Sequence, residues 1–224
     1  MCVPEELALD MEQSDFCEYE TLFDEVEAMN ITIAANAIDL LTDEGVLEYV
    51  TVRKLYKQDE PLDENQAFRK KFNWFYKVRA RTVWYSNFYR YFEELQRGDR
   101  RCDFREVLTD LWNENRICGV QVSFVSKMLN MIDPRLPIID TQVLHYLGFE
   151  ETGLVDKKGV IKGSKECRIE NAVQVYEKLQ EVYSAYLETD ECECRLRQFD
   201  ERFPYAADMP RLKKVDFLCW VLGR

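Results

Sequence analysis

The sequence has few of the features that mark an exported or membrane protein. No apolar run approaches the roughly 20 residues that a transmembrane helix needs. The first residues, Met1-Cys2-Val3-Pro4-Glu5-Glu6, lack the basic start and apolar stretch of a signal peptide. There are no internal repeats and no long Ser/Gly linkers. We therefore expect a globular protein of the cytoplasm that does not associate with a membrane.

Metal ligands in suitable groups are also scarce. The chain of 224 residues has one histidine, His145, and eight cysteines without regular spacing. A protein of this size that stays inside the cell does not need disulfides. The closest pair, Cys192 and Cys194, has no second Cys or His pair near it in sequence, as a structural zinc site would require. We expect reduced cysteines, no metal and no cofactor.

Positive charge is missing from the first quarter of the chain. Residues 1–52 contain fourteen acidic side chains and no Lys or Arg, whereas the rest carries +2 and the whole chain −12. The net charge argues against a general nucleic-acid binder, but the acidity belongs to one segment. Two interpretations of that segment stay open. It covers a basic surface and competes with phosphate, or it keeps N-terminal helices soluble.

Hydrophobic spacing predicts a mainly α-helical fold. Apolar residues recur at intervals of three and four along most of the chain, and strand patterns are few. We expect a long aromatic helical segment and several shorter helices, over 64–97, 104–115, 121–131, 141–147, 170–187 and 215–222. Residues 153–163, with three glycines and three lysines, predict a loop or a small hairpin.

One motif carries chemical information. Ile117-Cys118-Gly119-Val120-Gln121-Val122-Ser123 places a glycine turn between two predicted helices. The apolar run Leu136-Pro137-Ile138-Ile139 then leads to Asp140, which opens another helix. This layout resembles the helix-hairpin-helix DNA glycosylases of the 8-oxoguanine-glycosylase-like fold, most closely an uncharacterised bacterial branch. The likeness is strongest over about 104–148.

The resemblance implies a two-lobed helical architecture and a catalytic carboxylate at Asp140. A fixed carboxylate stabilises the positive charge that builds on the sugar during cleavage of the base–sugar bond. Ser123 stands where bifunctional members carry a nucleophilic lysine, so the resemblance implies monofunctional hydrolysis. Lys127 lies one helical turn further on the same face. Asp140 is also a favoured helix N-cap in any protein.

Two groups of residues are candidates for DNA contact. The resemblance implies that the hairpin residues Gly119, Val120 and Gln121 present backbone N–H groups to a DNA phosphate. Two positions depart from the family's hairpin, since Cys118 and Gln121 replace its proline and its second glycine. Residues 69–90 hold seven basic and no acidic side chains, interleaved with aromatic residues, which is a pattern for phosphate contact and base stacking. Its candidates are Lys70, Lys71, Lys77, Arg79 and Arg81. The alternative is a buried aromatic helix with a solvated basic face.

Together these features predict a single helical unit over 1–224, with an acidic segment at 1–52. Its expected function is base-excision DNA repair, by hydrolysis of the N-glycosidic bond of a damaged or modified base. The alternative is a catalytically inert module on the same fold that binds nucleic acid or a protein partner. An open polar pocket beside Asp140 favours the enzyme, and a pocket filled by aromatic side chains favours the binding module.

Overall fold

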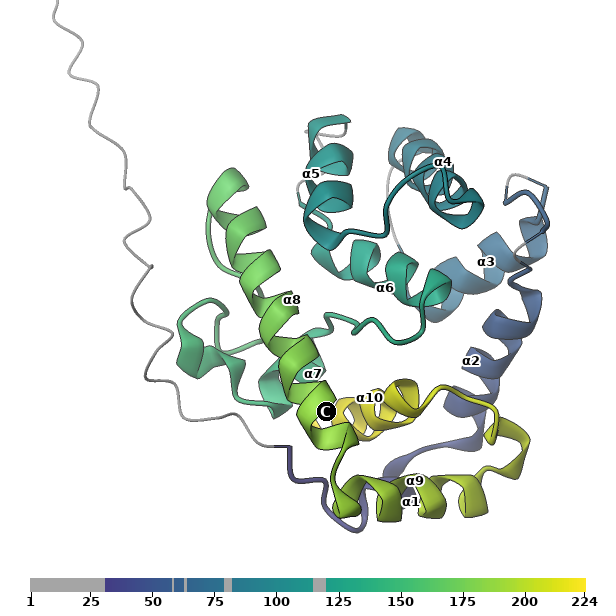
Figure 1. Ribbon diagram of the computed structural model, residues 1–224, viewed down its shortest axis with the longest axis vertical. Helices are drawn as coiled ribbons and strands as arrows, with labels where there is room; N and C mark the ends of the chain where they lie inside the picture. Colours follow the sequence, from purple (N-terminus) through teal and green to yellow (C-terminus); the bar gives the residue numbers. More distant parts are fainter. Residues whose placement is uncertain (1–30, 58, 63, 79–81, 115–119) are drawn as a thin grey trace, which may run out of the picture.

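The computed structural model describes residues 31–224 apart from 58, 63, 79–81 and 115–119. Within these ranges the chain forms ten α-helices, two short 3-10 helices and no named strand (Figure 1). The mainly α-helical class predicted from the sequence is therefore confirmed. No helix in the described part of the chain is long and apolar enough to cross a bilayer.

The helices follow one another with short connections. The first six are α1 (Ala37–Leu40), α2 (Asp43–Leu55), α3 (Gln66–Phe75), α4 (Thr82–Arg97), α5 (Phe104–Glu114) and α6 (Val122–Ile132). The last four are α7 (Thr141–Tyr146), α8 (Lys165–Leu187), α9 (Asp190–Arg202) and α10 (Arg211–Leu222). The 3-10 helices η2 (Phe149–Thr152) and η3 (Pro204–Ala206) follow α7 and α9.

Side-chain caps define where several helices begin. Thr42 accepts a hydrogen bond from the Gly45 N–H at the start of α2, and Asn65 accepts one from Phe68 at the start of α3. Thr189 caps α9 through Cys192 in the same way. Each cap satisfies a backbone donor that the helix itself leaves without a partner. These short polar side chains therefore set the boundaries of the helices around the pocket described below.

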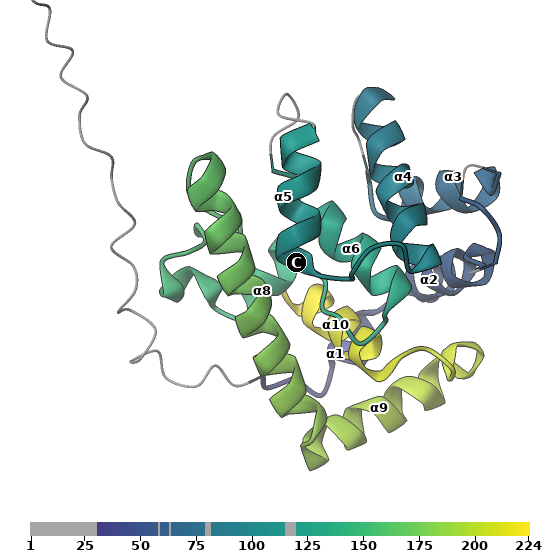
Figure 2. The ribbon, with the colours of Figure 1, turned by 45° about the horizontal axis from the view of Figure 1, so that its top comes forward.

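The helices gather in two groups. In both ribbon views α3, α4, α5 and α6 lie together on one side, while α1, α9 and α10 lie on the other (Figures 1 and 2). The long α8 runs along the molecule from one group to the other, and α2 leads into α3. Packing of α7 against α10, of α2 against α3 and of α5 against α6 connects these elements.

The interior is unusually aromatic between α3 and α4. Six rings from these helices are buried and contact one another, namely those of Phe68, Phe72, Tyr76, Trp84, Phe88 and Phe92. Edge-to-face and offset pairs of this kind add to the free energy gained from burying the rings. For most aromatic residues of the 69–90 stretch, the interpretation as a buried stripe is therefore correct.

The prediction of one continuous helix over 64–97 is wrong. The segment forms two helices, with α3 ending at Phe75 and α4 beginning at Thr82. Lys77 has a φ of 53°, and the Val78 N–H reaches back to the Asn73 carbonyl, which closes the end of α3. The apolar spacing continues across this turn, so periodicity alone gave no sign of it.

Other boundaries also differ from the prediction. α8 begins at Lys165 and α10 at Arg211, earlier than the apolar spacing indicated. The highly charged α9 was not predicted, because its buried face has few apolar residues. Residues 153–163 form a tight turn with a single antiparallel bridge, between Val155 and Ile161. The spacing of Leu22, Phe23, Val26 and Met29 also predicts a helix, and Asp63 is a candidate helix cap, but these residues lie outside the described part of the chain.

We predict that Phe72→Ala destabilises the protein strongly. Phe72 is fully buried and contacts the rings of Phe68, Tyr76, Phe88 and Phe92, so truncation leaves a cavity and costs about 3–5 kcal/mol. Urea unfolding measures this loss. Leu47→Ala is the control, because Leu47 is about half exposed and its loss should change the free energy of unfolding by under about 0.5 kcal/mol. Equal effects of the two substitutions would contradict the assignment of the core.

Candidate functional site

Two buried polar side chains on α6 hold the segment that leads to Asp140. The Ser126 hydroxyl accepts a hydrogen bond of 3.0 Å from the Ile139 N–H, and the Asn130 amide donates one of 2.7 Å to the Leu136 carbonyl. Both side chains are fully buried. The extended segment pairs with no strand in the described part of the chain, so these bonds replace those of a sheet. They bring Asp140 beside the middle of α6.

Asp140 caps α7 with one carboxylate oxygen and faces a lysine with the other. Its Oδ1 accepts a hydrogen bond of 3.1 Å from the Gln142 N–H, and its Oδ2 lies 3.7 Å from Lys127 Nζ. About a quarter of the side chain is exposed. The interpretation of Asp140 as a helix cap is thus confirmed. Its second carboxylate oxygen takes no part in the cap and faces the ammonium of Lys127.

Lys127 is a nearly buried lysine on α6. It is 8% exposed, donates a hydrogen bond of 2.9 Å to the Ser123 hydroxyl, and has its ammonium 5.4 Å from the centre of the Tyr76 ring. Burial lowers the pKa of Lys127, the carboxylate of Asp140 opposes that change, and the nearby ammonium of Lys213 adds to it. A lysine held this way is more easily deprotonated than an exposed one.

These groups open onto a pocket of about 370 Å³ between α2, α3, α6 and α10. Five rings line it, those of Trp74, Phe75, Tyr76, Phe217 and Trp220, so the pocket is open beside Asp140 as the enzymatic interpretation requires, but it is mostly apolar rather than polar. The other residues that line it are Thr42, Glu44, Gly45, Glu48, Lys77, Lys127, Ile138, Asp140, Lys213 and Asp216. A mostly apolar hollow with a few convergent polar groups is typical of small-molecule sites.

A second ion pair, not predicted from the sequence, lies in the same pocket. Lys213 and Asp216 on α10 form an ion pair, and both are at least 95% buried. The Tyr183 hydroxyl donates to the second Asp216 oxygen at 3.3 Å, and the Lys213 ammonium lies 4.7 Å from the Phe217 ring centre. Two charges in an apolar C-terminal segment were the available sequence signal. Both charges are buried because most of α10 is covered by neighbouring helices.

Tyr76 contributes a polar atom without a protein partner. Its hydroxyl is buried and has no hydrogen-bond partner among the described residues, although the side chain lines the pocket. Burial raises the pKa of Tyr76, and Tyr49 and Asp216 raise it further. The phenol therefore stays protonated, and it can donate a hydrogen bond to a bound molecule that displaces the side chains covering it. A buried hydroxyl left unpaired costs about 1–3 kcal/mol, which such a molecule would recover.

The structure brings Ser123, Lys127 and Asp140 together, and Lys127 is buried rather than solvated. Ser123 lies behind Lys127, while Lys127 and Asp140 line the pocket itself. Gly119, at the tip of the predicted hairpin, lies outside the described residues. Val120 is buried, and Gln121 is half-buried at the start of α6. The contact of Gly119, Val120 and Gln121 with a phosphate stays a prediction.

The basic residues of the 69–90 stretch differ in their surroundings. Lys70 is exposed, Lys71 forms an ion pair with Glu48, and Lys77 lies at the edge of the pocket. Arg79 and Arg81 lie outside the described residues. The Glu48–Lys71 pair is one contact between the acidic segment and the basic stretch. Elsewhere, Asp43 pairs with Arg202 on α9, so the described part of the segment also packs away from that stretch.

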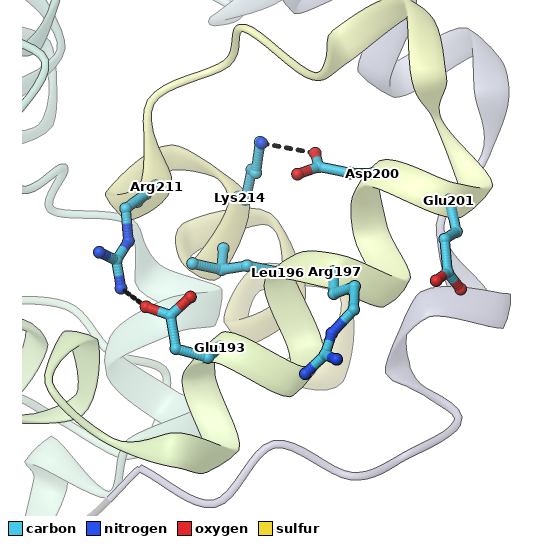
Figure 3. Close-up of a pocket in the computed structure, with 7 residues that line it drawn as sticks. All are labelled: Glu193, Leu196, Arg197, Asp200, Glu201, Arg211 and Lys214. Atoms are coloured by element: carbon cyan, nitrogen blue, oxygen red, sulfur yellow. Dashed lines mark hydrogen bonds and ion pairs between the residues drawn. The ribbon is translucent and has the colours of Figure 1, made fainter.

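A larger hollow of about 640 Å³ lies between α9 and α10 (Figure 3). Two ion pairs connect the helices that line it, one between Lys214 and Asp200 and one between Arg211 and Glu193. These pairs fasten α9 to α10, and Asp140 does not belong to this hollow. Within the described ranges, no three His, Cys, Asp or Glu side chains come together in a way that could hold a metal ion.

We predict that Lys127 titrates below the ordinary lysine value of 10.5, because its ammonium is buried. In Asp140→Asn its pKa should fall further, since the neutral amide no longer attracts the ammonium. The measurement is an NMR titration of ¹³C-methylated lysines, with the Lys127 signal assigned from Lys127→Arg. Asp156→Asn, in the exposed turn at 153–163, is the control and should leave the Lys127 titration unchanged. A Lys127 signal that titrates at 10.5 or above would contradict the buried position.

Comparison of the chain with models of known families, with curated proteins and with solved structures gave no match. We therefore infer the function from the arrangement of residues in the pocket. Its elements are the carboxylate of Asp140, the buried amine of Lys127, the free phenol of Tyr76, and aromatic walls.

Proposed function

We propose that the pocket binds a damaged or modified base turned out of DNA, and that Asp140 supports hydrolysis of its N-glycosidic bond. The observation that carries the proposal is the position of Asp140. One carboxylate oxygen is fixed by the cap of α7, and the other lies at the wall of an aromatic pocket beside Lys127. A preorganised negative charge at this place is what an oxocarbenium-like transition state requires.

The reaction follows from the charges involved. As the bond between the base nitrogen and the sugar C1′ breaks, its electron pair leaves with the base and positive charge builds on the sugar. Asp140 stabilises that charge and accepts a proton from a water molecule, whose oxygen forms the new bond to C1′. The departing base takes up a proton, and the products are a free base and an abasic sugar.

The pocket offers suitable contacts for a planar base. Aromatic rings provide flat apolar surfaces, and the Tyr76 hydroxyl is a donor with no protein acceptor among the described residues. Enzymes that act on a base inside a duplex must first take it out of the stack and into a pocket of this kind. On this proposal the two groups of helices correspond to the two lobes of a helix-hairpin-helix glycosylase, and Gly119, Val120 and Gln121 hold the DNA backbone.

We predict that Asp140→Asn abolishes base release and leaves DNA affinity nearly unchanged. The wild-type protein and the variant would be incubated with oligonucleotides that each contain one damaged base, as duplexes and as single strands. Abasic product is detected by alkaline cleavage. The loss should reach at least about 100-fold, the scale of removing one preorganised electrostatic group. A variant with full activity, or a wild-type protein that releases no base from a broad panel, would contradict the proposal.

The cap of α7 provides the matched control. Asparagine caps a helix about as well as aspartate, whereas alanine at Asp140 costs about 1 kcal/mol of stability. Asp140→Asn should therefore keep the cap while losing activity, and its loss of stability at neutral pH comes only from leaving the buried Lys127 ammonium without a counter-charge. Asp140→Ala should lose both. If activity falls only in proportion to stability, Asp140 is a structural cap, and the inert binding module becomes the better description.

A second candidate function is cleavage of the DNA backbone at the abasic sugar. The observation that favours it is the lowered pKa of Lys127 in the pocket wall. A neutral amine attacks the aldehyde carbon of the opened sugar, water leaves, and the resulting imine makes elimination of the 3′ phosphate easier. Lys127 would then perform the step that Ser123, one turn earlier, cannot.

We predict that borohydride joins the wild-type protein covalently to an oligonucleotide that contains an abasic site. Hydride reduces the imine to a stable amine, so a protein–DNA band appears on a denaturing gel. Lys127→Arg should give no band, because arginine keeps the positive charge beside Asp140 but forms no imine. If the protein releases the base but no protein–DNA band forms, hydrolysis is its only activity and the second candidate function is wrong. Trapping that persists in Lys127→Arg would assign the amine to another residue.

A further inference from the structure

The edge of the pocket carries an exposed tryptophan between two lysines. Trp74 is 51% exposed and lines the pocket. The ammonium groups of Lys71 and Lys77 lie 4.9 Å and 4.5 Å from the centre of its ring. Most other rings of α3 and α4 are buried in the core, so burial does not explain this one. Both ammonium groups lie over the indole, so an aromatic ligand with negative charge suits this place: its ring replaces them on the indole while its anionic group binds them.

The backbone at Lys77 is strained in a way that favours this interpretation. Lys77 has a φ of 53° and is the one residue other than glycine with positive φ in the described part of the chain. It follows the end of α3, where the Val78 N–H bonds to the Asn73 carbonyl. Glycine is the usual residue at such a position, because a side chain there is sterically unfavourable. The lysine therefore occupies a place that stability alone would give to glycine.

The charges around Trp74 further restrict the kind of ligand that can bind there. Many arginines of the nearby helices already form ion pairs, namely Arg90 with Glu94 and Glu114, Arg97 with Glu93, Arg100 with Glu94 and Asp110, and Arg105 with Glu170. Duplex binding at physiological salt usually rests on many phosphate contacts. The pocket edge offers two lysines, one of them shared with Glu48. A ligand held here must gain much of its affinity from stacking.

We propose that Trp74, Lys71 and Lys77 form a subsite for an unpaired nucleotide of single-stranded nucleic acid. The base stacks on the indole, and the two lysines contact the two phosphates that flank this nucleotide, one of which links it to the nucleotide in the pocket. A base can use an indole face in this way only when it is out of the duplex stack. This inference rests on the proposed function, and it narrows the substrate to strands that are unpaired next to the target base.

The test measures binding of three labelled oligonucleotides by fluorescence anisotropy. They are a single strand of 12 nucleotides, a strand of equal length with abasic spacers in place of bases, and the duplex. The single strand should bind most tightly. Its affinity should fall with salt with a logarithmic slope of about −1.4, from two phosphate contacts at about −0.7 each. The spacer strand keeps the phosphates and loses the bases, so it should bind roughly 5- to 150-fold more weakly.

Three variants separate stacking, charge and folding. Trp74→Ala should weaken binding of the single strand by the same roughly 5- to 150-fold and leave the spacer strand unchanged. Lys77→Asn, which tolerates positive φ, should reduce the salt slope to about −0.7. Lys77→Gly should bind as weakly as Lys77→Asn while its melting temperature is equal to or above that of the wild type, because the strain is removed. Lys157→Gln and Leu47→Ala are exposed controls that should change nothing.

The outcomes distinguish this inference from the proposed function. Equal binding of the spacer strand, or unchanged binding by Trp74→Ala, overturns the subsite. Base release from a duplex at the same rate as from a single strand, in both wild type and Trp74→Ala, overturns the subsite and leaves glycosylase activity standing. Tight, Trp74-dependent binding without base release from any substrate supports the subsite and removes the enzymatic proposal.

Discussion

The hydrogen bonds that α6 makes to the segment 136–139 are the constraint on which the candidate site depends. Ser126 and Asn130 bind backbone groups of Ile139 and Leu136, and Lys127 lies between these two positions on the same helix. Among the described residues no strand pairs with this segment, and side chains set its position. Because the same turn of α6 supplies the supports and the lysine, the distance between Lys127 and Asp140 follows from the helix geometry.

The pocket has charged groups of both signs in an apolar setting. Lys127 and Asp140 form one pair, and Lys213 and Asp216 form another that is almost completely buried. Removing charges from water is costly, and an ion pair repays that cost only when its remaining donors and acceptors find partners. Asp216 finds one in Tyr183. The Tyr76 hydroxyl has none among the described residues, and a ligand that supplies an acceptor would complete the arrangement.

The sequence predicted helix existence better than helix boundaries. Apolar spacing correctly indicated α5, α6, α7 and most of α8, because each buries one face. It failed between α3 and α4, where the spacing continues through a turn that Lys77 makes with a positive φ and without glycine. It also failed for α9, which is held by Leu196, Phe199 and ion pairs with α10 rather than by a broad apolar face.

By itself the sequence determined the helical class, the near-neutral charge of the chain outside residues 1–52, the shared helix face of Ser123 and Lys127, and the capping position of Asp140. These depend on local spacing, since residues four apart on a helix share a face and an aspartate before a helix caps it. Only the tertiary structure decided that Lys213, Asp216 and Tyr76 join the same pocket and that Trp74 remains exposed at its edge. These residues come from helices far apart in the chain, and their meeting depends on how α3, α6 and α10 pack, which no local pattern encodes.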